Sequence, residues 1–223
     1  ARRRREAARE LEQLAKKGQR AAPVVIEGRT IASTFWGKAW CDNLERYSDY
    51  ENRVPRGRTY VRNGSVLDLQ VGSREIRALV SGSRLYKVAV KVAALPKARW
   101  RAVCRDCAGG IDSLVELLQG RLSKAVMERI SCRGTGLFPA PTEIEFSCSC
   151  PDWADMCKHV AAVLYGVGAR LDTKPELLFL LRGVDHEELI GSGIGAVTTA
   201  TAGKKTGRRR IAAEQIEAVF GIE

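Results

Sequence analysis

The apolar and polar residues between positions 59 and 93 alternate with a period of two, which predicts an antiparallel sheet. From Leu67 to Val71 every second side chain is apolar, and the same period returns in the next two apolar stretches. The pair Asn63-Gly64 is typical of a tight hairpin turn. We therefore expect four strands in a meander, with one packed face and one wet face, at residues 59–62, 65–71, 75–80 and 85–93.

Spacings of three and four residues predict helices on both sides of this stretch. The N-terminal residues 1–20 show a short basic helix with a weak apolar stripe. Trp36, Trp40 and Leu44 share one face of a second helix, which we expect to bury its indoles in the core. The alternative is a platform on which bases stack, built from the aromatic residues of this region: Phe35, Trp36, Trp40, Tyr47 and Tyr50.

The C-terminal half is predicted to be mostly helical. Apolar residues from Ile111 to Val126 keep helical spacing over more than four turns, with Asp112 or Ser113 at the start, and we expect this helix to be the main element packed on the residues that follow. A second apolar helix begins near residue 160 and is expected to stop at Gly168. Shorter helices are expected at residues 176–182, 185–190 and 211–220.

These elements predict an α+β fold, in which an antiparallel β-meander with helices is joined to a small zinc-bound ββα finger. The expected regions are a basic N-terminal helix or arm (1–22), an α+β region with the sheet (23–100), a helical region (101–190) that contains the finger (144–171), and a flexible linker with a basic C-terminal helix (191–223).

Three cysteines and a histidine within twelve residues carry the clearest chemistry. Cys148, Cys150, Cys157 and His159 follow the spacing C-x-C-x6-C-x-H. Side chains two apart on an extended chain point the same way, so the first two thiols leave one face of a strand or tight hairpin together. The last two ligands converge on them if Cys157 precedes a helix and His159 lies in its first turn, with Asp155 as a helix cap.

Three thiolates and one imidazole are the ligand set of a closed structural zinc site, and we expect one Zn²⁺. Lys158 would partly offset the net negative charge of such a site. Ordinary buried cysteines beside a core histidine are the alternative, but three cysteines and a histidine within twelve residues argue against it. Disulfides fit less well, because neighbouring C-x-C cysteines bond poorly and the total of seven cysteines is odd.

The same residues resemble the SWIM zinc finger. The aromatic residue after C-x-C-P-D and the apolar helix after C-K-H add to the likeness, which extends over roughly residues 30–190 to bacterial SWIM zinc finger family proteins. The wider match rests on four stretches: Trp36-Gly37-Lys38-Ala39-Trp40, residues 58–64, residues 111–120 and residues 157–171. The resemblance implies a zinc-stabilised module that binds DNA or proteins, associated with helicase ATPases of the SWI/SNF type.

The net charge of +11 favours a polyanionic partner, nucleic acid before an anionic membrane surface. Guanidinium groups around a tyrosine in the expected first hairpin suit phosphate contact and base stacking. The alternative is a solvated basic surface with no specific partner. The candidate nucleic-acid-binding residues are Arg56, Arg58, Tyr60 and Arg62 in this hairpin, Arg3 and Arg4 in the N-terminal arm, and Lys204, Lys205, Arg208, Arg209 and Arg210 near the C-terminus.

The other cysteines do not predict a second site. Cys104, Cys107 and Cys132 would leave a tetrahedral metal one ligand short, and Gly109-Gly110 is not a thioredoxin-like context for a redox pair. We therefore assign no metal or redox role to them.

Catalysis is not expected from this chain. His159 is used for the metal, His186 stands between acidic residues, and no phosphate-binding P-loop or zinc-deaminase pattern is present. No secretory leader or membrane span is expected, and clustered thiols suit a reducing compartment, so the expected location is the bacterial cytoplasm, at the nucleoid.

We therefore expect a non-catalytic module that binds nucleic acid, DNA before RNA on the strength of the family resemblance. The expected setting is that of an accessory subunit of a SWI/SNF-type helicase ATPase. The alternative is a protein-interaction or regulatory subunit that does not itself contact nucleic acid.

Overall fold

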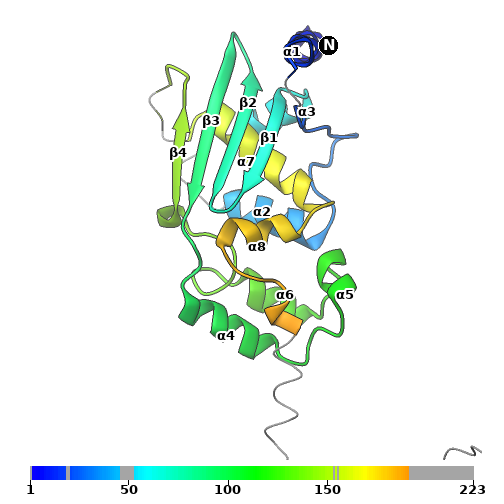
Figure 1. Cartoon of the computed structure of the whole chain (residues 1–223), viewed down its shortest axis with the longest axis vertical. Coiled ribbons are helices and arrows are strands. Elements are labelled where there is room, and N and C mark those ends of the chain that lie inside the picture. The colour runs from blue at the N-terminus through cyan, green and yellow to red at the C-terminus, as the bar shows by residue number, and fades with distance from the viewer. Residues whose placement is uncertain (1, 19–20, 46–52, 153, 155, 191–223) are drawn as a thin grey trace, which may run out of the picture.

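The computed structural model describes residues 2–18, 21–45, 53–152, 154 and 156–190. Its centre is a four-stranded antiparallel sheet of order β1-β2-β3-β4, with helices over one face and a group of helices below it (Figure 1). The α+β class is therefore confirmed. The strands are β1 (Val66–Gly72), β2 (Glu75–Ser81), β3 (Leu85–Val92) and β4 (Ile144–Cys148).

The alternating apolar residues of the strands lie on the packed face of the sheet, as predicted. On β3, Tyr86, Val88, Val90 and Val92 are buried, while the lysines between them are exposed. The edge of β1 is covered by the incoming chain, since Val24 donates its N–H to the Val66 carbonyl. The fourth strand is not residues 59–62. It is β4, which lies more than fifty residues after β3 and pairs with it from Val88↔Cys148 to Val92↔Ile144.

Residues 59–62 belong to a helix, so the expected first hairpin is wrong. Helix α3 runs over Val54–Arg62 and packs on the interior with Val54, Tyr60 and Val61 buried. It ends where the turn was expected: Gly64 has φ +70° and donates to the Val61 carbonyl. Ser65 donates to the Tyr60 carbonyl at 3.1 Å, which completes a Schellman-type helix end.

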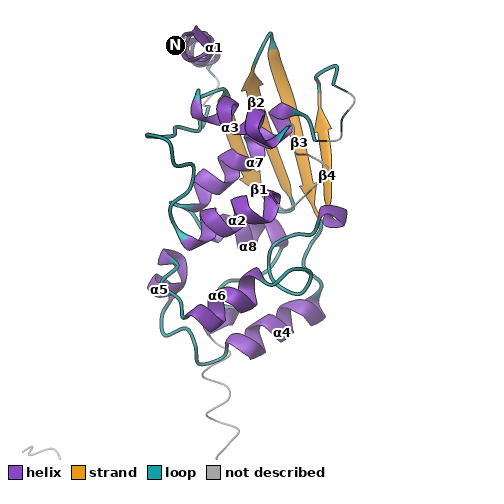
Figure 2. Cartoon of the chain, turned by 180° about the vertical axis from the view of Figure 1, so that it is seen from behind, coloured by secondary structure: helices purple, strands orange, loops and turns teal. Residues whose placement is uncertain are grey.

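A buried helix, α7 (Lys158–Leu171), lies between the sheet and two outer helices, α3 and α2 (Phe35–Glu45), as seen from both sides in Figures 1 and 2. Helix α2 buries both of its indoles, so the base-stacking alternative for Trp36 and Trp40 is wrong. Gly168 does not stop α7, contrary to expectation. A Cβ there would lie 2.6 Å from Cys41 Sγ, so glycine allows α2 to approach closely.

The single helix expected between Ile111 and Val126 is wrong. Helix α5 (Leu114–Gln119) ends at Gly120 with φ +66°, and α6 (Lys124–Ser131) begins after Ser123, whose hydroxyl accepts the Val126 N–H. The predicted helix start at Ser113 is confirmed, because the Ser113 hydroxyl accepts a hydrogen bond from the Glu116 N–H. The remaining helices of this lower part are α4 (Lys97–Cys107) and α8 (Glu176–Arg182), with a short 3₁₀ turn, Pro141–Glu143, leading into β4.

The expected basic N-terminal helix is present as α1 (Arg2–Lys16), which lies at the upper end of the sheet in Figure 1. Ala7 is buried there against Leu67, with Leu11 and Leu79 beside it. One hydrophobic core includes residues from Val24 to Leu189, on both sides of residue 100, and the expected domain boundaries stay a prediction. None of the helices described is long and apolar enough to cross a membrane.

Candidate metal centre

The end of β4 and the turn after it position the first two sulfurs. Cys148 is the last residue of β4 and faces the core, paired with Val88 of β3. The chain then stays attached to β3, because Ser149 donates its N–H to the Lys87 carbonyl and its hydroxyl accepts the Lys87 N–H. This fixes the turn that carries Cys150, one residue before Pro151.

The start of α7 positions the other two ligands. Cys157 is the residue before the helix, in extended conformation (φ −76°, ψ 170°), and His159 lies in the first turn, as predicted. The loop before them is held by Asp152, whose carboxylate pairs with the guanidinium of Arg53, the residue before α3, with both N···O distances 3.1 Å. The expected cap, Asp155, lies outside the described residues.

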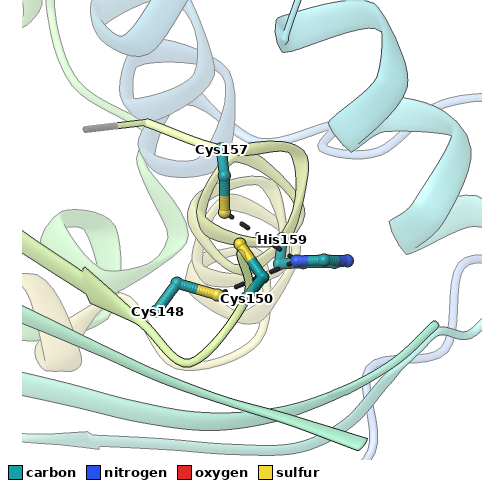
Figure 3. A group of neighbouring side chains, drawn as sticks. All are labelled: Cys148, Cys150, Cys157 and His159. Carbon is teal, nitrogen blue, oxygen red and sulfur yellow. Dashed lines mark hydrogen bonds between the residues drawn. The ribbon is translucent and has the colours of Figure 1, made fainter. Parts of the chain in front are cut away.

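All four ligand atoms point toward one position (Figure 3). The three Sγ atoms and the imidazole nitrogen lie within 4.8 Å of one another. His159 Nδ1 is 3.8 Å from Cys148 Sγ and 3.8 Å from Cys157 Sγ. Tetrahedral Zn²⁺, with bonds of about 2.3 Å to sulfur and about 2.0 Å to nitrogen, requires S···N separations of about 3.6 Å. The two S···N separations are close to this value, so the ligand set fits one zinc ion.

The chemistry of the sulfurs fits the same ion. The hydrogen bond from the Cys148 thiol, with further bonds from His159 and the Val160 N–H, lowers the pKa of Cys157 well below its ordinary value. The same bond, together with burial, raises the pKa of the Cys148 thiol above its ordinary range. The pair thus shares a proton between two converging sulfurs. A zinc ion would take the place of that proton, since the thiolate is the form that binds the metal.

Two tyrosines hold the imidazole in place. His159 is only 1% exposed; the Tyr86 ring stacks on it with a centroid distance of 4.2 Å, and Tyr60 meets it edge-on at 5.4 Å. Four protein ligands leave a tetrahedral ion without an open position, which is the arrangement of structural zinc. The alternation of apolar and polar residues in β3 predicts that Tyr86 lies on the packed face, but it does not indicate that the ring contacts a metal ligand.

Tyr60 is not the exposed stacking residue that the sequence suggested. It is 6% exposed, on the face of α3 that packs against α7, and the expectation of an exposed ring is wrong. Arg58 is also engaged: it pairs with Glu45 and donates to the Tyr165 hydroxyl at 2.8 Å. Burial lowers the pKa of Arg58, but these two hydrogen bonds outweigh it and raise the pKa, so the charge stays within a local network.

Arg56 and Arg62 are exposed on the solvent side of α3. The other candidates for nucleic-acid contact are not tested by the structure. The Arg3 and Arg4 side chains, and the whole C-terminal group with its linker and helix, lie outside the described residues: Lys204, Lys205, Arg208, Arg209 and Arg210.

The remaining cysteines lie apart from this centre. Cys104 and Cys107 are buried on α4, and burial raises the pKa of Cys107, while Cys132 is exposed after α6. Within the described ranges, the ligand set on β4 and α7 is the only cluster of this kind that could hold a metal ion.

Comparison with known proteins gives two matches of different extent. The family model of the SWIM zinc finger matches residues 146–167, which include all four ligands. The chain is also 34% identical over 165 residues to "uncharacterized protein Rv2102" of Mycobacterium tuberculosis, an alignment that covers 73% of this chain. The chain spans 59% of the length of that relative. No solved structure matches the chain.

Proposed function

Because residues 146–167 are a SWIM zinc finger, we propose that the chain is a non-catalytic module that binds nucleic acid, DNA in preference to RNA. Zinc would join β4 to α7 and thereby hold a basic surface in one conformation. We further propose that it acts as an accessory subunit of a SWI/SNF-type helicase ATPase at the bacterial nucleoid.

The observation that carries the proposal is the position of exposed positive charge next to the finger. The chain has a net charge of +11, and α3, which carries the exposed Arg56 and Arg62, packs directly on the finger helix α7. Fixed guanidinium groups on a rigid surface suit phosphate contact. Helix α7 itself is buried and cannot enter a DNA groove, so backbone contact is favoured over base readout.

The absence of catalysis is supported by how the polar groups of the site are used. All four ligands come from the protein, which leaves no position for an activated water. The nearest described carboxylate in the finger loop, Asp152, is paired with Arg53. His186 lies 3.8 Å from Asp185 and apart from the metal centre.

A salt titration tests nucleic-acid binding. The zinc-loaded chain should bind a labelled duplex of about 20 base pairs. The logarithm of its binding constant should fall linearly with the logarithm of the salt concentration, because each phosphate contact releases counterions. Arg56→Gln should weaken binding and reduce the salt slope by about one unit. Arg101→Gln, which removes an exposed arginine from the distant helix α4, is the matched control.

The second candidate, a protein-interaction subunit, is favoured by the outer face of the sheet. A hollow of about 500 Å³ there is lined by Leu79, Ala89 and polar residues of all four strands. Association with an ATPase that tolerates high salt, without duplex binding at any salt, would support this candidate and contradict the first.

A further inference from the structure

Two hollows meet beside the metal centre, on the side of His159 that faces away from the sulfurs. One, of about 440 Å³, is lined by Arg56, Thr59, Tyr60 and Lys158. The other, of about 490 Å³, is lined by Glu6, Tyr60, Gly82, Ser83, Tyr86, Lys158 and His159. They share Tyr60 and Lys158, so together they form one groove between α3, the β2–β3 turn and the start of α7, called here the α3–α7 groove.

The groove contains two cations, Arg56 and Lys158, that form no ion pair with a described residue. Neither Arg56 nor Lys158 has a carboxylate partner within the described part of the chain, whereas the neighbouring Arg53 and Arg58 are both paired. The Lys158 ammonium lies 6.0 Å from the centroid of the Tyr60 ring, which holds it over the groove. Among the residues that line the two hollows, Glu6 of α1 is the only acid.

A buried donor faces the same groove. With a metal on Nδ1, the proton of the neutral imidazole is on Nε2, and metal-bound histidines almost always donate this second N–H to an acceptor. His159 Nε2 is buried and has no hydrogen-bond partner among the described residues. Figure 3 shows it pointing away from the three sulfurs. A Cβ on residue 82 would lie 3.3 Å from this nitrogen, so glycine keeps the approach to it open.

These groups select the chemistry of the ligand. The Tyr60 ring is covered by His159 and Lys158, and the Tyr86 ring is stacked on His159, so neither ring can receive a base. What remains is a set of donors and positive charges that suits a tetrahedral oxyanion. The thiolates lie behind the imidazole, on its Nδ1 side, away from the groove.

We propose that the α3–α7 groove binds one phosphate group of the nucleic-acid backbone. Lys158 and Arg56 supply the charge, and the zinc-oriented His159 N–H forms the inner wall. The inference rests on the proposed function and adds a defined contact point to it. Glu6 of α1 also lines the groove, where its carboxylate would oppose a bound anion.

Binding of the labelled duplex by zinc-loaded full-chain variants tests this site. Lys158→Gln should weaken binding about tenfold, as expected for loss of a charge-assisted hydrogen bond. Lys97→Gln removes an exposed lysine on α4, away from the groove, and should change binding less than about twofold. Glu6→Gln should tighten binding. Each variant must retain one equivalent of zinc, which separates loss of the groove from loss of the finger.

Inorganic phosphate provides a readout that does not depend on nucleic acid. Added at constant ionic strength against chloride, it should shift the imidazole ¹⁵N and ¹H signals of His159 but not those of His186, and Arg56→Gln and Lys158→Gln should each reduce the shift. The groove is not the site if Lys158→Gln and Lys97→Gln bind the duplex with equal affinity and phosphate does not shift the His159 signals. The proposed function would stand in that case, because the duplex still binds. If phosphate shifts His159 but no nucleic acid binds, the anion site stands and the proposed function fails.

Discussion

Cys157 has two roles in one position, since it supplies a metal ligand and is also the residue at which α7 begins. Its backbone is in the extended conformation of a helix N-cap, but its side chain makes no capping bond and points to the other sulfurs instead. A bound metal would therefore add a fixed point at the start of α7.

Replacing Cys157 with serine tests the ligand assignment. A hydroxyl is a poor ligand for Zn²⁺ beside two thiolates, so Cys157→Ser should lose most of the single equivalent of zinc found in the parent chain. Cys132→Ser, which changes an exposed cysteine away from the site, should keep the full equivalent. Metal content measured on both purified variants decides the matter, and full zinc in Cys157→Ser would mean that the ligand is another residue.

A buried ion-pair cluster gives a second test at this scale. Arg182 is completely buried and pairs with Glu143 at 3.2 Å, and Arg99 pairs with the same carboxylate at 3.1 Å. Burial raises the pKa of Glu143, but the Ala140 N–H bond and the charges of Arg182 and Arg99 outweigh it, and the pKa is lowered. The carboxylate thus stabilises the fold above its ordinary pKa of 4.5, and this contribution is lost as pH falls through the lower folded value.

Glu143→Gln should therefore reduce the free energy of unfolding by about 3 kcal/mol at neutral pH, because it leaves a buried guanidinium without its counter-charge. The difference from the parent chain should begin to shrink below about pH 4.5, where the unfolded carboxylate takes up a proton, and should be lost as the pH falls through the lowered pKa of the folded carboxylate. Urea unfolding of both proteins at several pH values measures this difference. A difference that stays constant down to pH 3 would exclude the ion pair as its cause.

At the scale of the elements, α3 is held against α7 by a glycine. A Cβ on Gly57 would lie 2.5 Å from the Ala161 Cβ and 2.9 Å from the Ala162 nitrogen, which belong to the buried part of α7. Backbone atoms cannot move aside as a flexible side chain does, so the two helices would have to separate.

Gly57→Ala should consequently destabilise the chain by about 2 kcal/mol, because overpacking outweighs the better helix propensity of alanine. Gly72→Ala is a suitable control, since a Cβ there meets only the Glu75 carbonyl oxygen at 3.7 Å. Thermal or urea unfolding compares the two. Equal stability of both variants would show that α3 does not depend on close approach to α7.

The same elements show how far the sequence determines the fold. Strands β1, β2 and β3 were predictable because their alternation is local. Asn63-Gly64 was not decisive, because the pair ends a helix as readily as it turns a hairpin. Gly120 lies within the helical pattern from Ile111 to Val126 but ends α5 in the left-handed conformation. The pairing of β4 with β3 has no local signal at all, since it joins residues more than fifty positions apart.

At the scale of the whole molecule, the metal centre joins two layers of the fold. Cys148 and Cys150 come from the sheet layer, Cys157 and His159 from the buried helix, and the Arg53–Asp152 pair adds α3 to the same point. The ligands were predictable because they lie within twelve residues of one another. The α3–α7 groove was not, because Arg56, Ser83 and Lys158 meet only in the folded chain.

Amide hydrogen exchange of the zinc-loaded chain before and after chelation tests the central claim, that zinc holds β4 to α7. Removal of the metal should strongly reduce protection in residues 144–150 and in the first turn of α7, and extend to α3, while β1 and β2 remain protected. Readdition of zinc should restore the original pattern. Unchanged protection in β4 and the start of α7 after complete removal of the metal would contradict the account.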